Sequence, residues 1–470
     1  MKFINQNTAV SDGDDTCRFS DIAGHFESIK KVFHRNFVGR DDPVVLSCSN
    51  SLPGALTLLY LLEEGYNFLL IGMEPDDGAG YFPCFCRYKI VAGYGEKKGE
   101  RTGADDYLRI IENYDHVPAD LTGETGPKLL LRTSGSTGVP KMAVHSHTML
   151  KGNAGNCITR LGLGENSRIA IPVPITHMYG LGAAFLPGML AGAAVDLQAG
   201  ANLLRFIQRE TVFNPDTAFM TPVFCETLLK GRRSSRKYKL TVTAGDRFRN
   251  KESFERYESL FGPLVNLYGS TEMGAMTAAS ADEPISVRSE AAGNPMDGVL
   301  IRTEKKEAVK GEGMRSMLWC KHPYGFGGYI DESGIPLGEC VRENDGWFCT
   351  KDLGEVLPGG SIRVFGRNDH SVNRDGLLVS FADVESGLQQ ISGIDSAIVV
   401  AKGESRRGKR LIACIIPEKG ADTDESRVRA SCFDLLPNRA VPDEIRFLKS
   451  LPLLASGKVD RQRLEVMVQD

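Results

Sequence analysis

The sequence predicts an α/β fold in which a large N-terminal domain of layered sheets and helices, ending in a small β section, precedes a small α+β domain. Short apolar runs alternate with helical stretches through the first two thirds of the chain, which favours parallel sheets covered by helices. Gly-rich segments with turn signals follow from about Val299. A chain of 470 residues also exceeds what one ordinary core fills, so we expect more than one domain.

The elements of the alternating region are predicted from its apolar runs and the stretches between them. Residues 55–72 are the most apolar, but Glu63 and Glu64 interrupt them, so we expect a helix and a buried strand instead of a membrane span. We expect strands at residues 43–47, 68–71, 129–131, 169–172, 194–197, 218–220 and 240–243. We expect helices at residues 202–209, 223–230 and 251–260.

A second domain is predicted to begin after Arg367, which divides the chain into residues 1–367 and 368–470. The turn at residues 403–409 has the spacing of the common phosphate loop, but Arg410 replaces the required Ser or Thr, and the turn joins two strands instead of opening a helix. We therefore interpret it as a solvated, charged hairpin turn. The other expected elements of this domain are a helix and the two paired strands, at residues 382–390, 397–401 and 411–416.

Composition and charge argue against several classes of partner. A net charge of −4 and a pI of about 6.1 give no basic surplus, so we expect neither nucleic-acid binding nor membrane insertion. Residues 1–15 are polar and acidic, unlike a signal peptide. The 11 cysteines are odd in number and follow no repeating frame, which favours reduced thiols and a cytoplasmic location.

Two short cysteine and histidine patterns could suggest a metal site. Cys84 and Cys86 form C-x-C, but no second pair lies at a zinc-site distance, so we expect structural thiols. His145 and His147 stand two apart in a predicted extended stretch and would share one face of a strand. With no Cys or third His nearby, we expect them to pack and hydrogen-bond.

Residues 133–141 form a loop of small residues that ends in Pro140 and Lys141. Apolar residues on both sides predict strand, tight loop, strand. Glycines let the backbone approach an anion, successive N–H groups can hold it, and the lysine adds a mobile positive charge. We therefore expect a polyphosphate guest. A flexible Ser/Gly linker is the alternative, which the flanking strands disfavour. The spacing differs from that of the common phosphate loop.

A second segment, residues 266–272, carries groups that complement this loop. Tyr268 offers a flat face to an adenine, and Thr271 offers a hydroxyl to phosphate. Glu272 offers a hard oxygen to Mg²⁺, which prefers carboxylate and phosphate ligands. Alone, this segment would be better interpreted as an ordinary strand and turn with a surface Glu. Beside the loop, it favours a nucleotide site.

Both segments resemble motifs of the adenylate-forming, acyl-activating enzyme superfamily, and three further segments match it in the same order. Residues 346–354 resemble its ribose-binding segment, which implies that Asp352 accepts hydrogen bonds from both ribose hydroxyls. Residues 451–460 resemble its catalytic-lysine segment, which points to Lys458. The resemblance assigns ATP binding to Thr133, Ser134, Gly135, Ser136, Thr137, Gly138, Lys141, Tyr268, Gly269, Asp352 and Arg367.

The third segment, residues 366–369, resembles the hinge about which the superfamily's small, mobile domain turns. Arg367 is then expected at the ribose or phosphate oxygens, and Asp369 at the pivot. Gly376 retains the glycine that lines the thiol channel in the second half-reaction. Three residues depart from the usual motifs: Lys351 stands where the family usually has Gly, Asn373 where many members have Lys, and Leu378 where many have Arg.

Residues 172–182 resemble the acid-binding motif of acyl and aryl ligases, and lack the Asp with which amino-acid activators hold an α-amine. Residues 144–147, 243–246 and 269–273 resemble benzoate-type coenzyme A ligases in particular. We therefore expect an aryl or short acyl acid, with His177 near its carboxylate; a packed core histidine is the alternative. The expected acid-binding residues are His177, Tyr179, Gly180, Ala244, Gly245, Asp246 and Gly269.

The resemblance implies a reaction in two steps. The acid attacks the α-phosphorus of ATP and releases pyrophosphate, and a thiol then converts the acyl-AMP into a thioester. The expected catalytic residues are Lys458, His177, Thr271 and Glu272, with Mg²⁺ bound by Glu272. Coenzyme A is the expected thiol. Two alternatives stay open: a ligase that loads the phosphopantetheine of a carrier protein, and a non-catalytic ATP-binding relative.

Overall fold

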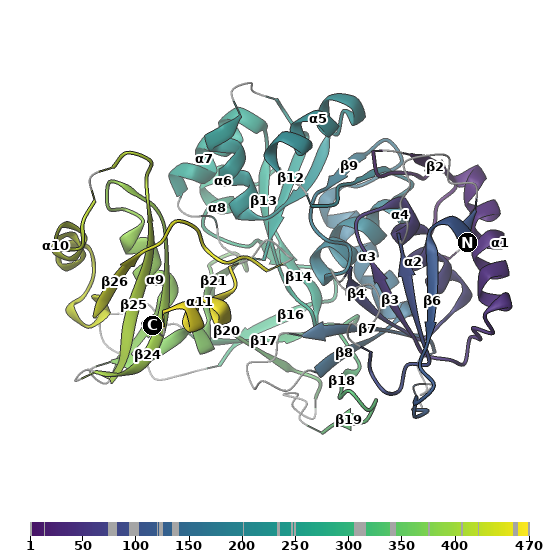
Figure 1. Cartoon of the computed structure of the whole chain (residues 1–470). Helices are drawn as coiled ribbons and strands as arrows, with labels where there is room; N and C mark the ends of the chain where they lie inside the picture. Colours follow the sequence, from purple (N-terminus) through teal and green to yellow (C-terminus); the bar gives the residue numbers. More distant parts are fainter. Residues whose placement is uncertain are drawn as a thin grey trace.

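A computed structural model gives the fold (Figure 1). It describes residues 2–13, 15–73, 82–93, 103–119, 121, 126–133, 141–200, 202–232, 236–245, 248, 251–304, 316–338, 345–374, 377–405, 408–421, 423–454 and 459–468. Several predicted site residues lie outside these ranges, namely Ser134, Gly135, Ser136, Thr137, Gly138, Asp246, Gly376 and Lys458.

A nine-stranded sheet forms one half of the large N-terminal part (Figure 1). Its order is β15 (Asn294–Pro295), β14 (Gly274–Ala278), β13 (Leu264–Ser270), β12 (Leu240–Ala244), β11 (Thr217–Met220), β9 (Arg168–Ile171), β10 (Ala194–Leu197), β1 (Ala9–Ser11) and β2 (Thr16–Arg18). The six strands from β13 to β1 pair in parallel. Helices connect several of them: α4 (Leu186–Ala191), α5 (Leu203–Phe213), α6 (Pro222–Gly231) and α7 (Lys251–Phe261).

An eight-stranded sheet forms the other half (Figure 1). Its order is β19 (Pro336–Leu337), β18 (Gly328–Ile330), β8 (Lys141–Ser146), β7 (Lys128–Thr133), β4 (Phe68–Gly72), β3 (Val44–Cys48), β5 (Tyr88–Ala92) and β6 (Leu108–Glu112). Its helices include α1 (Phe19–Arg35), α2 (Leu52–Glu64) and α3 (His147–Leu161). One apolar core contains residues of both sheets and of all three helices, so burial of this shared surface holds the halves together.

Two antiparallel-rich sheets follow. The first, of four strands, has the order β16 (Leu300–Thr303), β17 (Ser316–Lys321), β20 (Phe348–Val356) and β21 (Ile362–Arg367). The second, of five strands, contains β23 (Leu377–Ser380), β22 (Ser371–Arg374), β25 (Gly408–Pro417), β24 (Ile394–Ser405) and β26 (Glu444–Phe447). Helices α9 (Phe381–Leu388), α10 (Glu425–Leu435) and α11 (Arg461–Met467) accompany it, and its apolar clusters contain no described residue before Val372.

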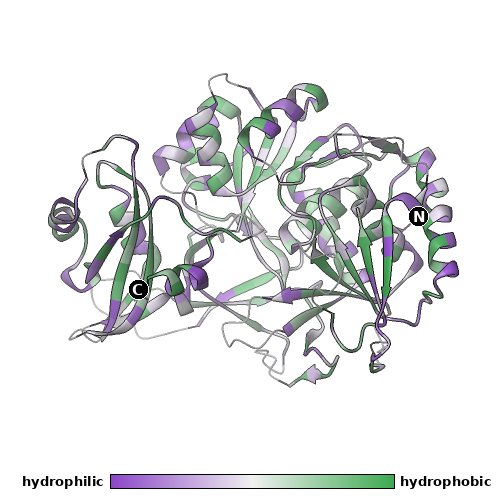
Figure 2. Cartoon of the chain, in the orientation of Figure 1, coloured by the Kyte–Doolittle hydropathy of each residue, from purple (hydrophilic) through white to green (hydrophobic). Residues whose placement is uncertain are grey.

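Hydropathy explains how these elements are placed (Figure 2). Hydrophobic residues concentrate along the strands, whereas the outer helix α1 carries both classes and buries Ile22, Ile29, Val32 and Phe33. Helix α2 is almost entirely buried; the Ser51 side chain caps its first turn and Gly65 ends it at φ 76°. Across the described ranges, no helix has both the length and the apolar character to cross a membrane.

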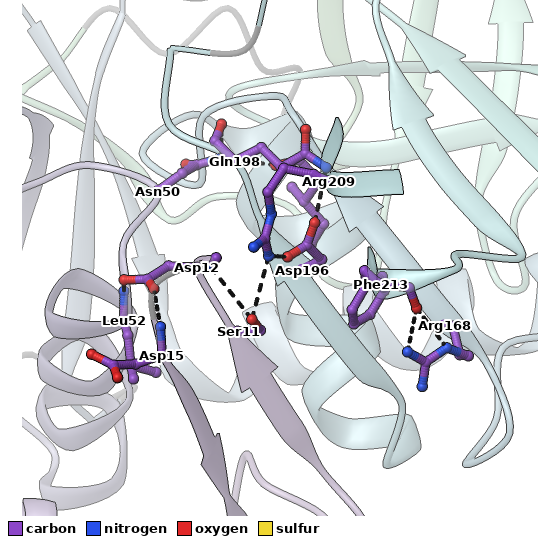
Figure 3. Close-up of polar contacts among 12 residues, drawn as sticks. Ser11, Asp12, Asp15, Asn50, Leu52, Arg168, Asp196, Gln198, Arg209 and Phe213 are labelled. Carbon is purple, nitrogen blue, oxygen red and sulfur yellow. Dashed lines mark hydrogen bonds and ion pairs between the residues drawn. The ribbon is translucent and has the colours of Figure 1, made fainter. Parts of the chain in front are cut away.

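A buried polar cluster fastens the outer strands of the nine-stranded sheet to α5 (Figure 3). Arg209 of α5 donates to Asp196 of β10 and to the Ser11 hydroxyl of β1. Gln198 donates to the second oxygen of Asp196 at 2.9 Å. Asp12 accepts a hydrogen bond from the backbone N–H of Leu52 at 2.8 Å, which links β1 to the start of α2.

The predicted fold class is confirmed, and each strand and helix predicted in the alternating region is present with boundaries shifted by a few residues. β24 and β25 pair antiparallel up to Ser405 and Gly408, which agrees with the predicted hairpin, and residues 406 and 407 between them lie outside the described residues. Two predictions were wrong. Residues 328–330 pair with β8 in the eight-stranded sheet instead of joining the small β section. His147 is the first residue of α3, so it does not share a strand face with His145.

Candidate nucleotide and acid site

Three of the predicted site segments lie at the carboxyl ends of parallel strands in the nine-stranded sheet. Residues 172–182 follow β9, Gly245 follows β12, and Thr271 and Glu272 follow β13. The parallel register pairs Ala244 with Leu267, which places the end of β12 beside the start of the Tyr268 segment. In open α/β sheets this edge is where ligands bind.

The loop of small residues is closed by a two-strand ladder. Thr133 ends β7 and pairs with Lys141, which begins β8. The Thr133 hydroxyl donates to the backbone carbonyl of Lys141 at 3.2 Å. The expected strands on both sides of the loop are therefore present, and the interior of the loop, residues 134–140, lies outside the described residues.

The turn that carries Thr271 and Glu272 depends on a close backbone approach. A Cβ added to Gly269 would lie 2.3 Å from the Gly274 carbonyl oxygen, so only glycine fits where β13 bulges against β14. His145 of β8 contacts the Thr271 carbonyl through Nε2 at 2.8 Å. This contact ties the turn to β8, the strand that follows the predicted phosphate loop.

Tyr329 of β18 is a site residue that the sequence analysis missed. Its hydroxyl donates to Oε1 of Glu272 at 2.7 Å, and Nζ of Lys141 lies 4.4 Å from the centre of its ring. The sequence offered only a tyrosine in a Gly-rich stretch. Its role depends on the pairing of β18 with β8, which no local pattern indicates.

Asp352 is aimed by a bulge in β20. The register of β20 against β17 shifts between the pairs Cys349–Trp319 and Leu353–Met317, so β20 has more residues than β17 in this stretch. Lys351 lies in it and has φ 60°, in the left-handed region. A left-handed φ favours glycine, which is the residue the family usually has at this position, and here Lys351 adopts that conformation. Asp352 is 8% exposed, and the Thr350 hydroxyl accepts a hydrogen bond from its backbone N–H.

The partners of Asp352 are the predicted nucleotide residues. Tyr268 donates its hydroxyl hydrogen to Oδ2 of Asp352 at 2.6 Å, and Nε of Arg367 lies 3.7 Å from Oδ1. Burial, and next the Asp352 carboxylate, raise the pKa of Tyr268 well above its ordinary range, so this hydroxyl remains a donor. The pairing of Asp352 with Arg367 across β20 and β21 brings the two together.

The segment predicted to bind the acid, residues 172–182, is held by Asn50, a second residue that the sequence did not indicate. Its Nδ2 donates to the carbonyls of Ile171 and Val173 at 3.0 and 2.8 Å, and its Oδ1 accepts from the N–H of Ile175 at 2.8 Å. The loop therefore leaves β9 on a fixed path, and His177 reaches the surface with an exposed side chain. The alternative of a packed core histidine is wrong.

A π-helix, Tyr179–Phe185, continues the motif. The Tyr179 hydroxyl lies within hydrogen-bonding distance of two backbone carbonyls, 2.7 Å from that of Val242 and 3.0 Å from that of Met220, so it bridges β12 and β11. A Cβ on Gly180 would lie 2.1 Å from the carbonyl oxygen of Pro174, so this glycine allows the turn to close. Such π-turns inside helices frequently mark functional sites.

The remaining predicted residues lie near these elements. Gly245 has φ 97° directly after β12. Asp369 lies in a 3₁₀ turn, Asn368–His370, between the four-stranded and five-stranded sheets. Asn373 and Leu378 pair across β22 and β23.

Glu272 fits a magnesium ion that arrives with ATP. Among the described residues, no group of three or more His, Cys, Asp or Glu could hold a metal. Magnesium in nucleotide sites commonly takes only one or two carboxylates and completes its shell with phosphate oxygens and water. The half-buried Glu272, fixed through one oxygen by Tyr329, matches that requirement.

Comparisons with known proteins agree with this geometry. The AMP-binding enzyme family matches residues 93–330, and the AMP-binding enzyme C-terminal domain matches residues 383–458. The chain is 24% identical to a salicylyl-CoA synthase / salicylate adenylyltransferase from Streptomyces, over 78% of this chain and 67% of the relative. It is 27% identical to an indoleacetate–CoA ligase from Aromatoleum aromaticum, over 77% and 72%.

The fold is similar to that of solved structures as well. It superposes on the crystal structure of ATP-bound MatB from Rhodopseudomonas palustris with a TM-score of 0.80. The match covers 99% of this chain and 97% of that chain at 18% identity. At this identity the match carries the fold alone.

Proposed function

The chain belongs to the AMP-binding enzyme family of adenylate-forming ligases, and from that premise we propose that it activates an aryl or short acyl acid with ATP and passes the acyl group to coenzyme A. The observation that carries this proposal is that predicted nucleotide groups from three sheets meet residues at the end of β13. Tyr268 and Arg367 meet Asp352 on the ribose side, and Lys141 and Glu272 meet Tyr329 on the phosphate side.

Each group has a role in the first step. The loop from Thr133 to Lys141 holds the β and γ phosphates, and Asp352 accepts from the ribose hydroxyls. Glu272 would hold Mg²⁺, whose chemistry is to neutralise charge on the phosphates. Lys458 bridges the acid carboxylate and the α-phosphate as pyrophosphate leaves, so positioning and charge neutralisation dominate the catalysis.

The acid is bound at the ends of β9 and β12. His177 faces its carboxylate, while the π-helix at Tyr179 and the glycine at Gly245 shape the pocket wall. Amino-acid activators usually carry an Asp just after this motif to hold the α-amine, whereas this chain has Gly182, Ala183 and Ala184 there, which supports an acid without an α-amine.

The second step uses the C-terminal unit, which we place at residues 368–470. Rotation about Asp369 withdraws Lys458 and presents the loop at Gly376 to the thiol. Ten cysteines of the described residues are free thiols, which supports a cytoplasmic setting.

The deciding experiment measures pyrophosphate release with ATP and Mg²⁺ across aryl, short-chain, long-chain and amino acids. Each acid is tested alone, with coenzyme A, and with a phosphopantetheinylated carrier protein. We expect release with an aryl or short acyl acid that accelerates with coenzyme A. Acceleration only with the carrier protein would make the carrier, instead of coenzyme A, the thiol acceptor. No pyrophosphate release with any acid would favour the non-catalytic alternative.

Lys458→Ala tests the catalytic lysine. We expect acyl-AMP formation to fall by roughly 10²–10³-fold, as for loss of one preorganised donor, while thioester formation from supplied acyl-AMP is retained. Single-turnover assays of each half-reaction measure this. Lys449→Ala, which removes an exposed lysine from the same C-terminal unit, is the control. Equal loss in both half-reactions would contradict the assigned role.

A further inference from the structure

Tyr329 lies against Lys141 because of the strand register. β18 pairs antiparallel with β8, and Tyr329 stands opposite Ala143. Lys141 is two residues before Ala143, on the same face, so it is the diagonal neighbour of Tyr329 and within reach of a long side chain. Its Nζ lies 4.4 Å from the ring centre, which is a cation–π distance.

The hydroxyl of the same tyrosine reaches the other sheet. It donates to Oε1 of Glu272 at 2.7 Å. Tyr329 is buried, with 7% of the residue exposed. A hydroxyl bonded to a carboxylate is among the stronger hydrogen bonds, and burial limits competition from water. One side chain therefore contacts a cation from one sheet and an anion from the other.

The backbone before Tyr329 is fixed at both sheets. The N–H of Phe326 donates to the Glu272 carbonyl at 2.8 Å, and the N–H of Gly327 donates to the Val144 carbonyl at 2.7 Å. The ring of Phe326 packs edge-on against that of Tyr329, with centroids 4.8 Å apart. The Tyr329 side chain is therefore fixed in place, so the side chains of Lys141 and Glu272 adjust their conformations to contact it.

We propose that Tyr329 is a positioning residue that holds Lys141 and Glu272 in separate, ligand-ready directions. Without it, an adjacent lysine and glutamate can pair directly, which would neutralise the cation meant for phosphate and the carboxylate meant for the metal. The Tyr329 ring holds the Lys141 ammonium group by a cation–π contact, and the Tyr329 hydroxyl fixes the rotamer of the Glu272 carboxylate. This role rests on the proposed ATP-dependent function.

Three variants separate the ring from the hydroxyl. Tyr329→Phe keeps the ring under Lys141 and removes the bond to Glu272, whereas Tyr329→Leu removes both. Tyr324→Phe is the matched control, because it deletes a hydroxyl from the same Gly-rich segment while its ring packs against Gly152 of α3. Thermal unfolding of each variant checks folding.

The readout is ATP binding by calorimetry, with and without Mn²⁺ at constant ionic strength, so it does not depend on turnover. For Tyr329→Phe we expect metal-free ATP affinity to stay within about twofold of wild type, and the gain from Mn²⁺ to fall about tenfold, the loss of one hydrogen bond to a charged group. For Tyr329→Leu we expect a further loss of about threefold in metal-free affinity. Tyr324→Phe should match wild type in both.

Several results would overturn the proposal. A Tyr329→Phe variant with an undiminished Mn²⁺ gain would remove the hydroxyl role, and a Tyr329→Leu variant equal to Tyr329→Phe without metal would remove the ring role. If Tyr329→Leu fails to fold, the comparison of Tyr329→Phe with Tyr324→Phe still decides the hydroxyl. Wild type that binds no ATP at all would instead refute the proposed function.

Discussion

Two carboxylate–arginine pairs of this chain differ in what surrounds them. Asp196 and Arg209 lie at the outer strands of the nine-stranded sheet, with side chains 0% and 14% exposed (Figure 3). Asp352 and Arg367 lie at the candidate site. Their side chains are 11% and 41% exposed, and Oδ1 of Asp352 is 3.7 Å from Nε of Arg367. The first pair is closed off from solvent, whereas the second leaves its arginine largely open. Residue type alone therefore does not distinguish a structural ion pair from one at a binding site. The exposure of the side chains and the distance between the charged atoms do.

The comparison predicts that removing Arg209 affects mainly stability, whereas removing Arg367 affects mainly ATP binding. Arg209→Met should lower the free energy of unfolding by about 3–5 kcal/mol, because it leaves Asp196 buried without its cation. Burial already raises the pKa of Asp196, and Arg209 opposes that rise. Arg367→Met should cost less than about 1 kcal/mol in stability but impair ATP binding. Urea unfolding measures the free energy of unfolding, and calorimetry measures ATP affinity. An equal loss of stability in both variants would contradict the distinction between the two ion pairs.

The contrast extends to two histidines that stand two residues apart. Both are buried, but His145 contacts the Thr271 carbonyl of the site turn, whereas His147 packs edge-on against Phe3 and Phe68. Burial lowers the pKa of His147 from 6.5 to about 4. The unfolded chain therefore takes up a proton first as pH falls, and stability is lost between pH 6.5 and about 4, by about 3 kcal/mol in total.

His147→Phe tests this pH dependence. The variant should shift stability by a constant amount and lose the part of the pH dependence between pH 6.5 and about 4 that His147 contributes. Urea midpoints at several pH values measure it. An unchanged pH slope in the variant would show that other groups account for the dependence.

The smallest expected effect concerns the backbone that aims Asp352. Lys351 adopts φ 60°, a conformation that costs a non-glycine residue roughly 1 kcal/mol or more. Lys351→Gly should raise the free energy of unfolding by about 1 kcal/mol without reducing ATP affinity. Lys351→Ala keeps the strained backbone and is the control, with no gain expected. A gain in both variants would assign the cost to the lysine side chain instead.

Local signals predicted the alternating strands and helices well because each depends on its own apolar run. Motifs that are continuous in sequence also pointed to Tyr268, Asp352 and Arg367, which lie in contact in the structure, while their role in nucleotide binding stays a prediction. Tyr329 and Asn50 could not be predicted, because their roles arise from pairing between distant strands and from carbonyls that a loop turns inward. His147 was misplaced because the strand ends at Ser146, whose side chain caps the helix that His147 begins.

The short strand β18 also determines where this chain can be lengthened. Residues 326–330 are bonded to both sheets, so one added residue would flip the tyrosine to the opposite face. The next turn is different: Asp331 closes it by accepting from the N–H groups of Ser333 and Ile335, and Glu332 and Ser333 are exposed. A peptide tag or fluorescent reporter inserted between Glu332 and Ser333 would therefore lie within a few residues of Tyr329 while leaving the register of β18 against β8 intact.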